Sequence, residues 1–160
     1  MDADMLVKLY DLPDSTEIYK KAAEQGVTIH RAMAIDRDKI LDFVAENFYP
    51  AWVNETTLAL SSQPTTCYIA VKEGKVVGFA CYDATAKDFF GPTGVTESLR
   101  GKGIGTALLY RTLEAMREDG YGYAIIGWVS DALEFYQKTC NAAVIPDSFP
   151  GVYAHMVERN

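Results

Sequence analysis

Three glycines at alternate positions, Gly101, Gly103 and Gly105, constrain this chain more than any other feature of its sequence. They lead directly into the most regular helical pattern of the chain, GIGTALLYRTLEAMRE over residues 103–118. Glycine has no Cβ, so backbone amides in such a loop can approach a ligand closely. A helix N-terminus exposes unpaired N–H groups and carries about half a positive charge. The pattern therefore predicts an anion site suited to phosphate at the start of this helix.

The residues around the glycines are basic, although the chain as a whole is acidic. From Arg100 to Arg111 the sequence has three basic residues and no acidic residue, whereas the 160-residue chain has a formal net charge of −7. That net charge argues against nucleic acid as a partner, because neutralising its phosphates takes a surplus of Lys and Arg. The loop is thus a local positive patch on an acidic protein.

Two common phosphate-binding motifs do not fit the loop. A Walker loop needs GxxxxGK, and Thr96 stands at its first glycine position. A GxGxxG dinucleotide fingerprint fails because Leu108 replaces its third glycine. The Arg-x-x-Gly-x-Gly pattern in VTESLRGKGIGTALL, residues 95–109, resembles the signature of the GNAT superfamily of acyl-CoA-dependent N-acetyltransferases. The resemblance extends from about residue 28 to residue 157 and includes the segment FYQK at 135–138.

This resemblance implies a mixed α/β, GNAT-like fold, with a central and mostly antiparallel mixed sheet flanked by helices. We expect residues 1–160 to form one acetyltransferase domain with an N-terminal strand–helix extension over about residues 1–26. The implied reaction is acetyl transfer from acetyl-CoA to a primary amine by direct attack. Two alternatives stay open: a non-catalytic acyl-CoA sensor or interaction module of the same fold, and a nucleotide-binding protein that uses the same glycine loop.

The resemblance also assigns the residues that bind the co-substrate. Main-chain amides from Gly101 through Thr106 are implied to bind the pyrophosphate of acetyl-CoA. The pantetheine arm is implied to pair with residues 93–95 like an extra strand, which places the thioester carbonyl near the Val95 amide. The predicted cofactor-binding residues are Thr93, Gly94, Val95, Arg100, Gly101, Lys102, Gly103, Ile104, Gly105 and Thr106.

Tyr136 is the predicted general acid, because the family places a tyrosine here to protonate the departing CoA thiolate. Packing beside Phe135 is the alternative role for this ring. A general base is also needed, since an amine with a pKa of about 10.4 is neutral in roughly one molecule in a few thousand at pH 7. Glu97 is the first candidate, followed by Asp83 and Glu55, and a solvated surface acid is the alternative for each.

Three other observations concern the acceptor and the family pattern. Residues 47–52, NFYPAW, are expected to recognise the acceptor or else to form a lid over the core. Val129 stands where the family often has an asparagine that contacts the cofactor, whereas the usual alanine is kept as Ala132. Cys140-Asn141-Ala142 replaces the usual Gly-Phe or Gly-Ala.

Cysteine count, charge and hydropathy limit which partners the chain is expected to have. Three cysteines and two histidines without close spacing predict neither a disulfide framework nor a metal site. No apolar run approaches 18 residues, and the N-terminus is acidic where a signal peptide would be basic. We therefore expect a cytoplasmic protein with no membrane or nucleic-acid partner and a small-molecule or peptide amine as acceptor. Pairing of terminal strands in a homodimer stays open.

Periodicity and turn residues predict the secondary structure. Helices are expected at 14–24 with Asp14 as N-cap, from Asp36 to a stop at Pro50, at 103–118, and at 131–138 capped by Ser130 or Asp131, with a further helical turn or two within 51–60. Strands are expected at 3–10, 27–33, 65–71, 75–83, 89–97, 123–129, 142–146 and 151–157. Lys72-Glu73-Gly74 is expected to join 65–71 and 75–83 in a tight hairpin, and Gly91-Pro92 to interrupt 89–97. The helix at 103–118 is expected to bury the side formed by Ala107, Leu108, Leu113, Ala115 and Met116.

Thermal unfolding with acetyl-CoA, CoA, ATP or NAD distinguishes an acetyltransferase from a nucleotide-binding protein. A ligand at about 100 times its Kd stabilises a fold by about 2.7 kcal/mol, which is several degrees in Tm for a chain of this size. We expect a rise in Tm with acetyl-CoA and CoA only. A rise with ATP or NAD instead would favour the nucleotide-binding reading, and no rise with either CoA ligand would contradict the acetyltransferase reading.

Overall fold

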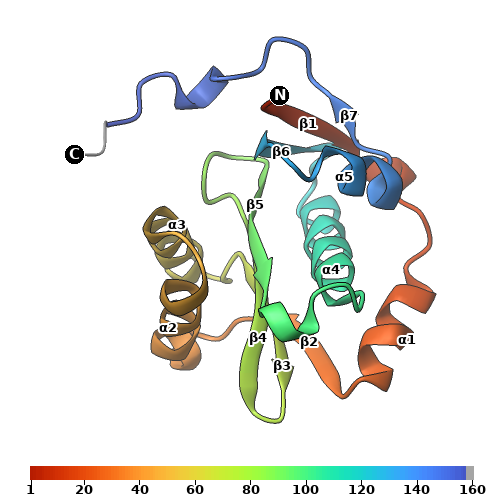
Figure 1. Ribbon diagram of the computed structural model, residues 1–160, viewed down its shortest axis with the longest axis vertical. Helices are drawn as coiled ribbons and strands as arrows, with labels where there is room; N and C mark the ends of the chain where they lie inside the picture. The colour runs from red at the N-terminus through yellow and green to blue at the C-terminus, as the bar shows by residue number, and fades with distance from the viewer. Residues whose placement is uncertain (158–160) are drawn as a thin grey trace.

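The computed structural model describes residues 1–157, in which a seven-stranded sheet carries helices on both faces (Figure 1). The strand order is β2-β3-β4-β5-β6-β1-β7. Every neighbouring pair is antiparallel except β5 and β6, so the predicted mixed, mostly antiparallel sheet is confirmed. The strands are β1 Ala3–Lys8, β2 Val27–Arg31, β3 Cys67–Lys72, β4 Lys75–Tyr82, β5 Phe89–Val95, β6 Tyr123–Val129 and β7 Ala143–Val144.

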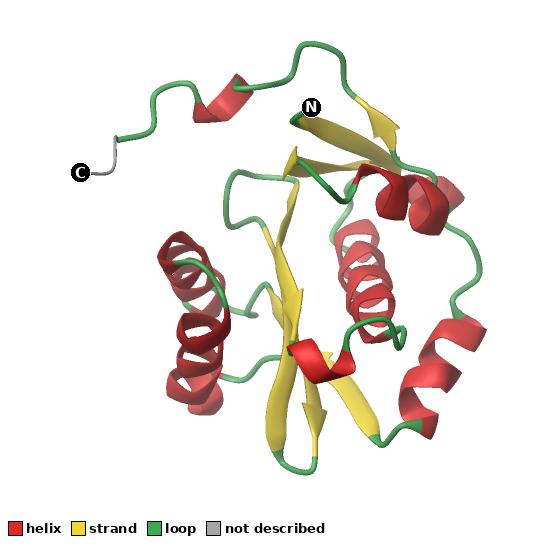
Figure 2. Cartoon of the chain, viewed as in Figure 1, coloured by secondary structure: helices red, strands yellow, loops and turns green. Residues whose placement is uncertain are grey.

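The helices form two layers around this sheet (Figure 2). One face is covered by α2 and α3, and the other face by α4 with α1 beside it (Figure 1). The side of α4 that its sequence pattern predicts to be buried is fully buried, at Ala107, Leu108, Leu113, Ala115 and Met116. The helices are α1 Thr16–Glu24, α2 Arg37–Asn47, α3 Pro50–Leu60, α4 Ile104–Glu118 and α5 Leu133–Cys140.

Turn chemistry explains the hairpin of β3 and β4. Lys72 pairs with Lys75, so the turn contains only Glu73 and Gly74. Both residues have positive φ, 51° and 74°, which is the conformation of a type I′ turn. In β5 the predicted interruption at Gly91 is a local irregularity, since the strand continues from Phe89 to Val95 and the register against β4 shifts opposite Gly91.

Several helix boundaries differ from those expected. Ser15, not Asp14, is the N-cap of α1, and Ala132 precedes α5 in place of Ser130 or Asp131. Pro50 follows α2 and is also the first residue of α3. At that position its missing N–H costs nothing. The helical turn or two expected within residues 51–60 is therefore an 11-residue helix.

The strand expected at residues 151–157 is wrong, and that at 142–146 is shorter than expected. β7 has two residues, and the chain then meets Pro146, which has no N–H to donate to a neighbouring strand. Gly151–Tyr153 forms a 3-10 turn that begins after Pro150 and at a positive φ of 54° for Gly151. The apolar residues of this segment, such as Val152, are exposed. Residues 151–157 therefore contain no strand.

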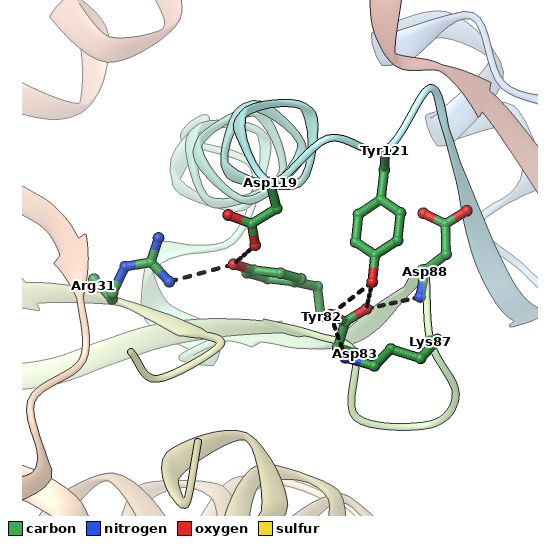
Figure 3. A network of polar contacts seen from close by, with 7 residues as sticks. All are labelled: Arg31, Tyr82, Asp83, Lys87, Asp88, Asp119 and Tyr121. Carbon is green, nitrogen blue, oxygen red and sulfur yellow. Dashed lines mark hydrogen bonds and ion pairs between the residues drawn. The ribbon is translucent and has the colours of Figure 1, made fainter. Parts of the chain in front are cut away.

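A polar network joins the C-terminal end of α4 to the β4–β5 loop (Figure 3). Tyr82 accepts a hydrogen bond from Arg31 at 3.3 Å and donates one to Asp119 at 2.6 Å. The hydroxyl of Tyr121 donates to both carboxylate oxygens of Asp83, at 3.0 and 2.9 Å. These contacts hold the start of β5 against the chain that enters β6.

Asp83 also binds groups of its own loop, and the carboxyl group of Asp88 beside it is poorly solvated. Asp83 accepts the Asp88 N–H at 2.7 Å and lies 3.6 Å from Lys87 Nζ. Asp88 Oδ1 is buried without a hydrogen-bond partner among the described residues. Burial, and then the charge of Asp83, raise the pKa of Asp88 to about 6.

Within residues 1–157, no helix combines the length and the apolar character that crossing a membrane requires.

Replacing Asp88 with Asn should change how stability depends on pH. The folded protein holds the Asp88 proton more tightly than the unfolded chain does, so wild-type stability falls as pH rises from about 4 through about 6. We expect Asp88→Asn to have a higher free energy of unfolding than wild type at pH 8, with the difference shrinking as pH falls through 6. Urea denaturation across this range measures it.

Asp42→Asn, at an exposed aspartate of α2, is the matched control and should run parallel to wild type. A constant offset between Asp88→Asn and wild type at all pH values would contradict the prediction.

Candidate active site

β5 and β6 share only two residue pairs and then separate. Phe89 pairs with Ile125 and Phe90 with Ile126, and beyond these pairs each strand follows a different neighbour. β4 continues to pair with β5 as far as Val95, and β1 continues to pair with β6 as far as Val129. A gap therefore opens in the middle of the sheet, toward the C-terminal ends of β5 and β6.

On the side of this gap, the backbone of β5 beyond Phe90 has no neighbouring strand. Thr96 N–H bonds to the carbonyl of Val77, so in the alternating antiparallel pattern Gly94 also exchanges its bonds with β4. Thr93 and Val95 direct their backbone groups the other way, toward the gap. The Val95 carbonyl is bound there by Arg100 Nε at 3.1 Å, and the Val95 N–H remains directed into the opening.

The glycine loop leads from β5 into α4. Gly101 and Gly103 have φ values of 76° and 87°, which L side chains rarely adopt, and Gly103 is the N-cap of α4. No side chain caps this helix. The first intrahelical bond runs from Ala107 N–H to the Gly103 carbonyl at 3.1 Å, so the amides of residues 104–106 have no partner within the helix. These amides lie at the positive end of the helix dipole, an arrangement that can bind an anion.

A pocket of about 240 Å³ lies against this loop. It collects residues from three elements: the end of β5, the glycine loop with the first turn of α4, and α5. The pocket brings together six of the predicted cofactor-binding residues and adds Phe135, which the sequence predicts only as a packing partner of Tyr136. Its lining is Val95, Leu99, Arg100, Gly101, Gly103, Gly105, Thr106 and Phe135.

The other four predicted cofactor-binding residues lie around the pocket without lining it. The Thr93 hydroxyl donates to the Phe79 carbonyl at 3.0 Å, so its proton is not available to a ligand. Gly94 lies under the ring of Phe48. Lys102 is exposed in the loop, and the Ile104 side chain is buried in the core beneath it.

Tyr136 lies in α5 with its ring directed into the core. It is 8% exposed, and the ring packs edge-on against Phe90 and Phe135, with centroids 6.4 and 5.1 Å away. Burial raises the pKa of the Tyr136 phenol well above its ordinary range. The hydroxyl is therefore protonated at neutral pH, as a proton donor must be.

The three candidate bases occupy different environments. Glu97 is exposed, in a 3-10 turn between β5 and the glycine loop. Asp83 is engaged in the network of Figure 3. Glu55 is half-buried on α3, where it accepts a hydrogen bond from Thr85, and burial raises the pKa of its carboxyl although this bond opposes the rise.

The aromatic segment after α2 forms part of the core and part of the surface. Phe48 and Trp52 pack on Phe79, with ring centroids 5.5 and 6.3 Å away, as the lid interpretation expects. Tyr49 is 62% exposed and meets Trp52 edge-on. Tyr49 is the most exposed of these three aromatic rings, whereas Phe48 and Trp52 are partly buried.

Val129 and Cys140 are both buried, and neither offers a polar or nucleophilic group to the site. Val129 is 4% exposed and packs in the core, so its side chain cannot contribute the hydrogen bond of an asparagine. Cys140 is buried, and burial raises the pKa of its thiol to about 11, which makes it a poor nucleophile. Among the described residues, no group of three or more His, Cys, Asp or Glu side chains could hold a metal ion.

Two segments outside the conspicuous motifs also reach the site region. Lys21 and Gln25 of α1 lie against the glycine loop. Tyr153 lies on the face of the sheet opposite α4, where its hydroxyl covers Gly127. A Cβ at Gly127 would collide with this hydroxyl and would meet Phe89 Cδ2 at 2.9 Å. The ring of Tyr153 stacks 5.0 Å from that of Trp128. No local sequence signal predicts these contacts, because they join residues far apart in the chain.

Comparisons with known proteins agree with this architecture. The Acetyltransferase (GNAT) family model matches residues 29–142. The glucosamine N-acetyltransferase region of a fungal multi-domain GH3 beta-N-acetylglucosaminidase has a TM-score of 0.74 at 15% identity, over 90% of this chain and 20% of that chain. A GCN5-related N-acetyltransferase from Sphaerobacter thermophilus has a TM-score of 0.67 at 19% identity, over 90% of this chain and 48% of that chain.

A putative acetyltransferase from Pyrococcus horikoshii has a TM-score of 0.53 at 23% identity, over 71% of this chain and 42% of that chain. At these identities the likeness shows a shared fold. The chain spans less than half the length of each of these three structures. No curated protein matches it significantly in sequence.

The contact between Gly94 and Phe48 gives a direct test of how tightly this region is packed. A Cβ at Gly94 would meet Phe48 Cε1 at 2.6 Å, so Gly94→Ala should lower the free energy of unfolding by about 1–3 kcal/mol. In a Phe48→Ala background the same substitution should cost much less, because the clashing ring is gone. Urea denaturation of the four proteins measures the coupling.

Gly105→Ala is the matched control, since a Cβ there would meet Val95 Cγ2 at an ordinary 3.6 Å, and it should leave stability unchanged or slightly raised. An equal cost of Gly94→Ala with and without Phe48 would show that the clash with the Phe48 ring does not cause the loss of stability.

Proposed function

The chain belongs to the GNAT acetyltransferase family, and from this we propose that it transfers an acetyl group from acetyl-CoA to a primary amine by direct attack, without an acyl-enzyme. One observation carries the proposal: the gap between β5 and β6 opens onto a basic glycine loop with free backbone amides at the start of α4. Backbone donors for a carbonyl and for a phosphate thereby lie at one site.

The amides of Gly101 through Thr106 would hold the pyrophosphate, and Arg100 would add positive charge beside them. The backbone of Thr93 and the N–H of Val95, which face the gap, support pairing with the amide-containing pantetheine arm, because buried backbone groups need hydrogen-bond partners. The Val95 N–H would then face the thioester carbonyl, where negative charge develops during attack. The residues present therefore fit acetyl-CoA as co-substrate.

Tyr136 would donate the proton that the departing thiolate needs. In model compounds this donation is uphill by about 1.5 pKa units, or roughly 2 kcal/mol, since a thiol has a pKa of about 8.5 and a phenol about 10. Burial raises the pKa of Tyr136 further, but a thiolate in the same apolar surroundings would also be destabilised. The difference between the two groups therefore governs the cost, and positioning can offset it.

Glu97 and Glu55 are the candidates for removing the proton of the amine, directly or through water. Glu97 is nearer in sequence to the predicted thioester site, just past the end of β5. Glu55 is supported by its environment, because a raised carboxyl pKa makes a better base near neutral pH. Asp83 is not supported, since its carboxylate already binds Tyr121 and Lys87.

The acceptor is proposed to be a small-molecule or peptide amine. A net charge of −7 favours cationic acceptors by electrostatic steering. The alternative function, an acyl-CoA-binding module without catalysis, is favoured by the core packing of Val129, which removes a polar contact that the family often has at this position. Acetyl-CoA binding without transfer to any amine would identify that alternative.

Tyr136→Phe tests the proposed mechanism. It removes the hydroxyl and keeps the ring that packs on Phe90, so we expect kcat to fall about 100-fold or more while the Kd for acetyl-CoA changes less than about 2-fold. Thiol release with polyamines, amino sugars, aminoglycosides and lysine peptides measures kcat, and titration calorimetry measures Kd.

Tyr10→Phe, at an exposed tyrosine outside the site, is the control and should behave as wild type. Unchanged turnover in Tyr136→Phe would remove Tyr136 from the proposed role. Failure of the wild-type protein to bind acetyl-CoA would overturn the proposed function itself.

A further inference from the structure

Helix α1 lies beside the glycine loop, although more than 75 residues of sequence separate the two (Figure 1). Gln25 Nε2 donates a hydrogen bond to the Lys102 carbonyl at 2.9 Å and another to the Lys21 carbonyl at 3.0 Å. The side chain of Lys21 covers Gly103: a Cβ at Gly103 would lie 3.2 Å from Lys21 Cδ and 3.5 Å from Lys21 Nζ. The lysine ammonium is therefore held next to the N-cap of α4.

This placement is fixed by contacts at the other end of α1. Ser15 Oγ donates to Glu114 Oε2 at 3.0 Å, and the Tyr19 hydroxyl donates to Glu114 Oε1. Ala22 is buried between these anchors and Gln25, at 3% exposed. Since α1 is attached to α4 at Glu114 and to the loop at Lys102, Lys21 occupies a set position relative to the loop amides.

The ammonium group of Lys21 has no carboxylate partner within residues 1–157. Its side chain is exposed, and no ion pair among the described residues includes it. Arg100 and Lys102 likewise form no ion pair there. Three cations from two distant parts of the chain thus border one loop of free N–H groups, in a protein that is acidic overall. Cations gathered without carboxylate partners are expected where the ligand itself is an anion.

We infer that Lys21 is a phosphate-binding residue of the acyl-CoA site, contributed by a helix outside the family match at residues 29–142. The inference rests on the proposed function, since it assumes that the loop binds the phosphates of CoA. The recognised group is a phosphate, either the pyrophosphate at the α4 amides or the 3′-phosphate of the ribose. A structural role is the competing explanation, because a lysine in the last turn of α1 also stabilises that helix end.

Lys21→Met tests this, because methionine keeps an apolar stem over Gly103 and removes only the charge. We expect the Kd for CoA to rise about 5-fold at 0.05 M salt, the upper range for an exposed ion pair, and to rise less at 0.5 M salt because of screening. Lys21→Arg should restore most of the affinity. Lys20→Met, at the neighbouring exposed lysine, is the matched control and should change the Kd less than about 2-fold.

Titration calorimetry with CoA and with dephospho-CoA, which lacks the 3′-phosphate, identifies the partner. A loss in Lys21→Met that persists with dephospho-CoA assigns Lys21 to the pyrophosphate, and a loss that disappears assigns it to the 3′-phosphate. Both results support the inference. It is overturned if Lys21→Met binds CoA as wild type does, with or without a lower Tm, or if Lys20→Met loses as much affinity. Absence of CoA binding by the wild-type protein overturns the proposed function together with this inference.

Discussion

The short parallel pairing of β5 and β6 is the constraint on which the rest of the site depends. Two residue pairs hold the strands together at Phe89 and Phe90, and the network around Asp83 and Tyr121 holds the same end from outside. Beyond this point the strands diverge, because β5 follows β4 while β6 follows β1. The divergence exposes backbone donors and acceptors in the middle of a sheet, where they would otherwise be paired. A ligand with its own amides can satisfy them.

The two ends of α4 have different surroundings. Basic side chains lie around the N-terminal end, and a hydrogen bond within the protein holds the C-terminal end. The N-terminal end meets the glycine loop with Arg100, Lys102 and Lys21 around it. The C-terminal end is followed by Asp119, a carboxylate that the helix dipole does not favour there, and Tyr82 compensates by donating a hydrogen bond to it. The cationic end is left open to an anion from outside, whereas the anionic end is satisfied by groups of the protein itself.

Much of this could be read from the sequence because it depends on local pattern. The apolar period of residues 103–118 gave the buried face of α4, and the Glu73-Gly74 turn gave the β3–β4 hairpin. The helix of residues 50–60 is longer than the sequence predicts, because its apolar residues show little periodicity and because Pro50 begins this helix. The last strand was overestimated because its apolar residues have no partner strand, and composition alone does not show whether one exists.

The sequence by itself determined the glycine loop and the helix that follows it, since each depends on residues within a few turns of one another. It also determined the family, because the family pattern lies in the order of motifs along the chain. Only the tertiary structure decided which groups surround that loop. Lys21, Gln25 and Phe135 reach it from other elements. Glu55 is half-buried on α3, and Val129 is packed in the core. The reason is that contacts between distant segments follow from how helices pack on the two faces of a sheet. That packing is set by the whole apolar surface of each element rather than by any short run of residues.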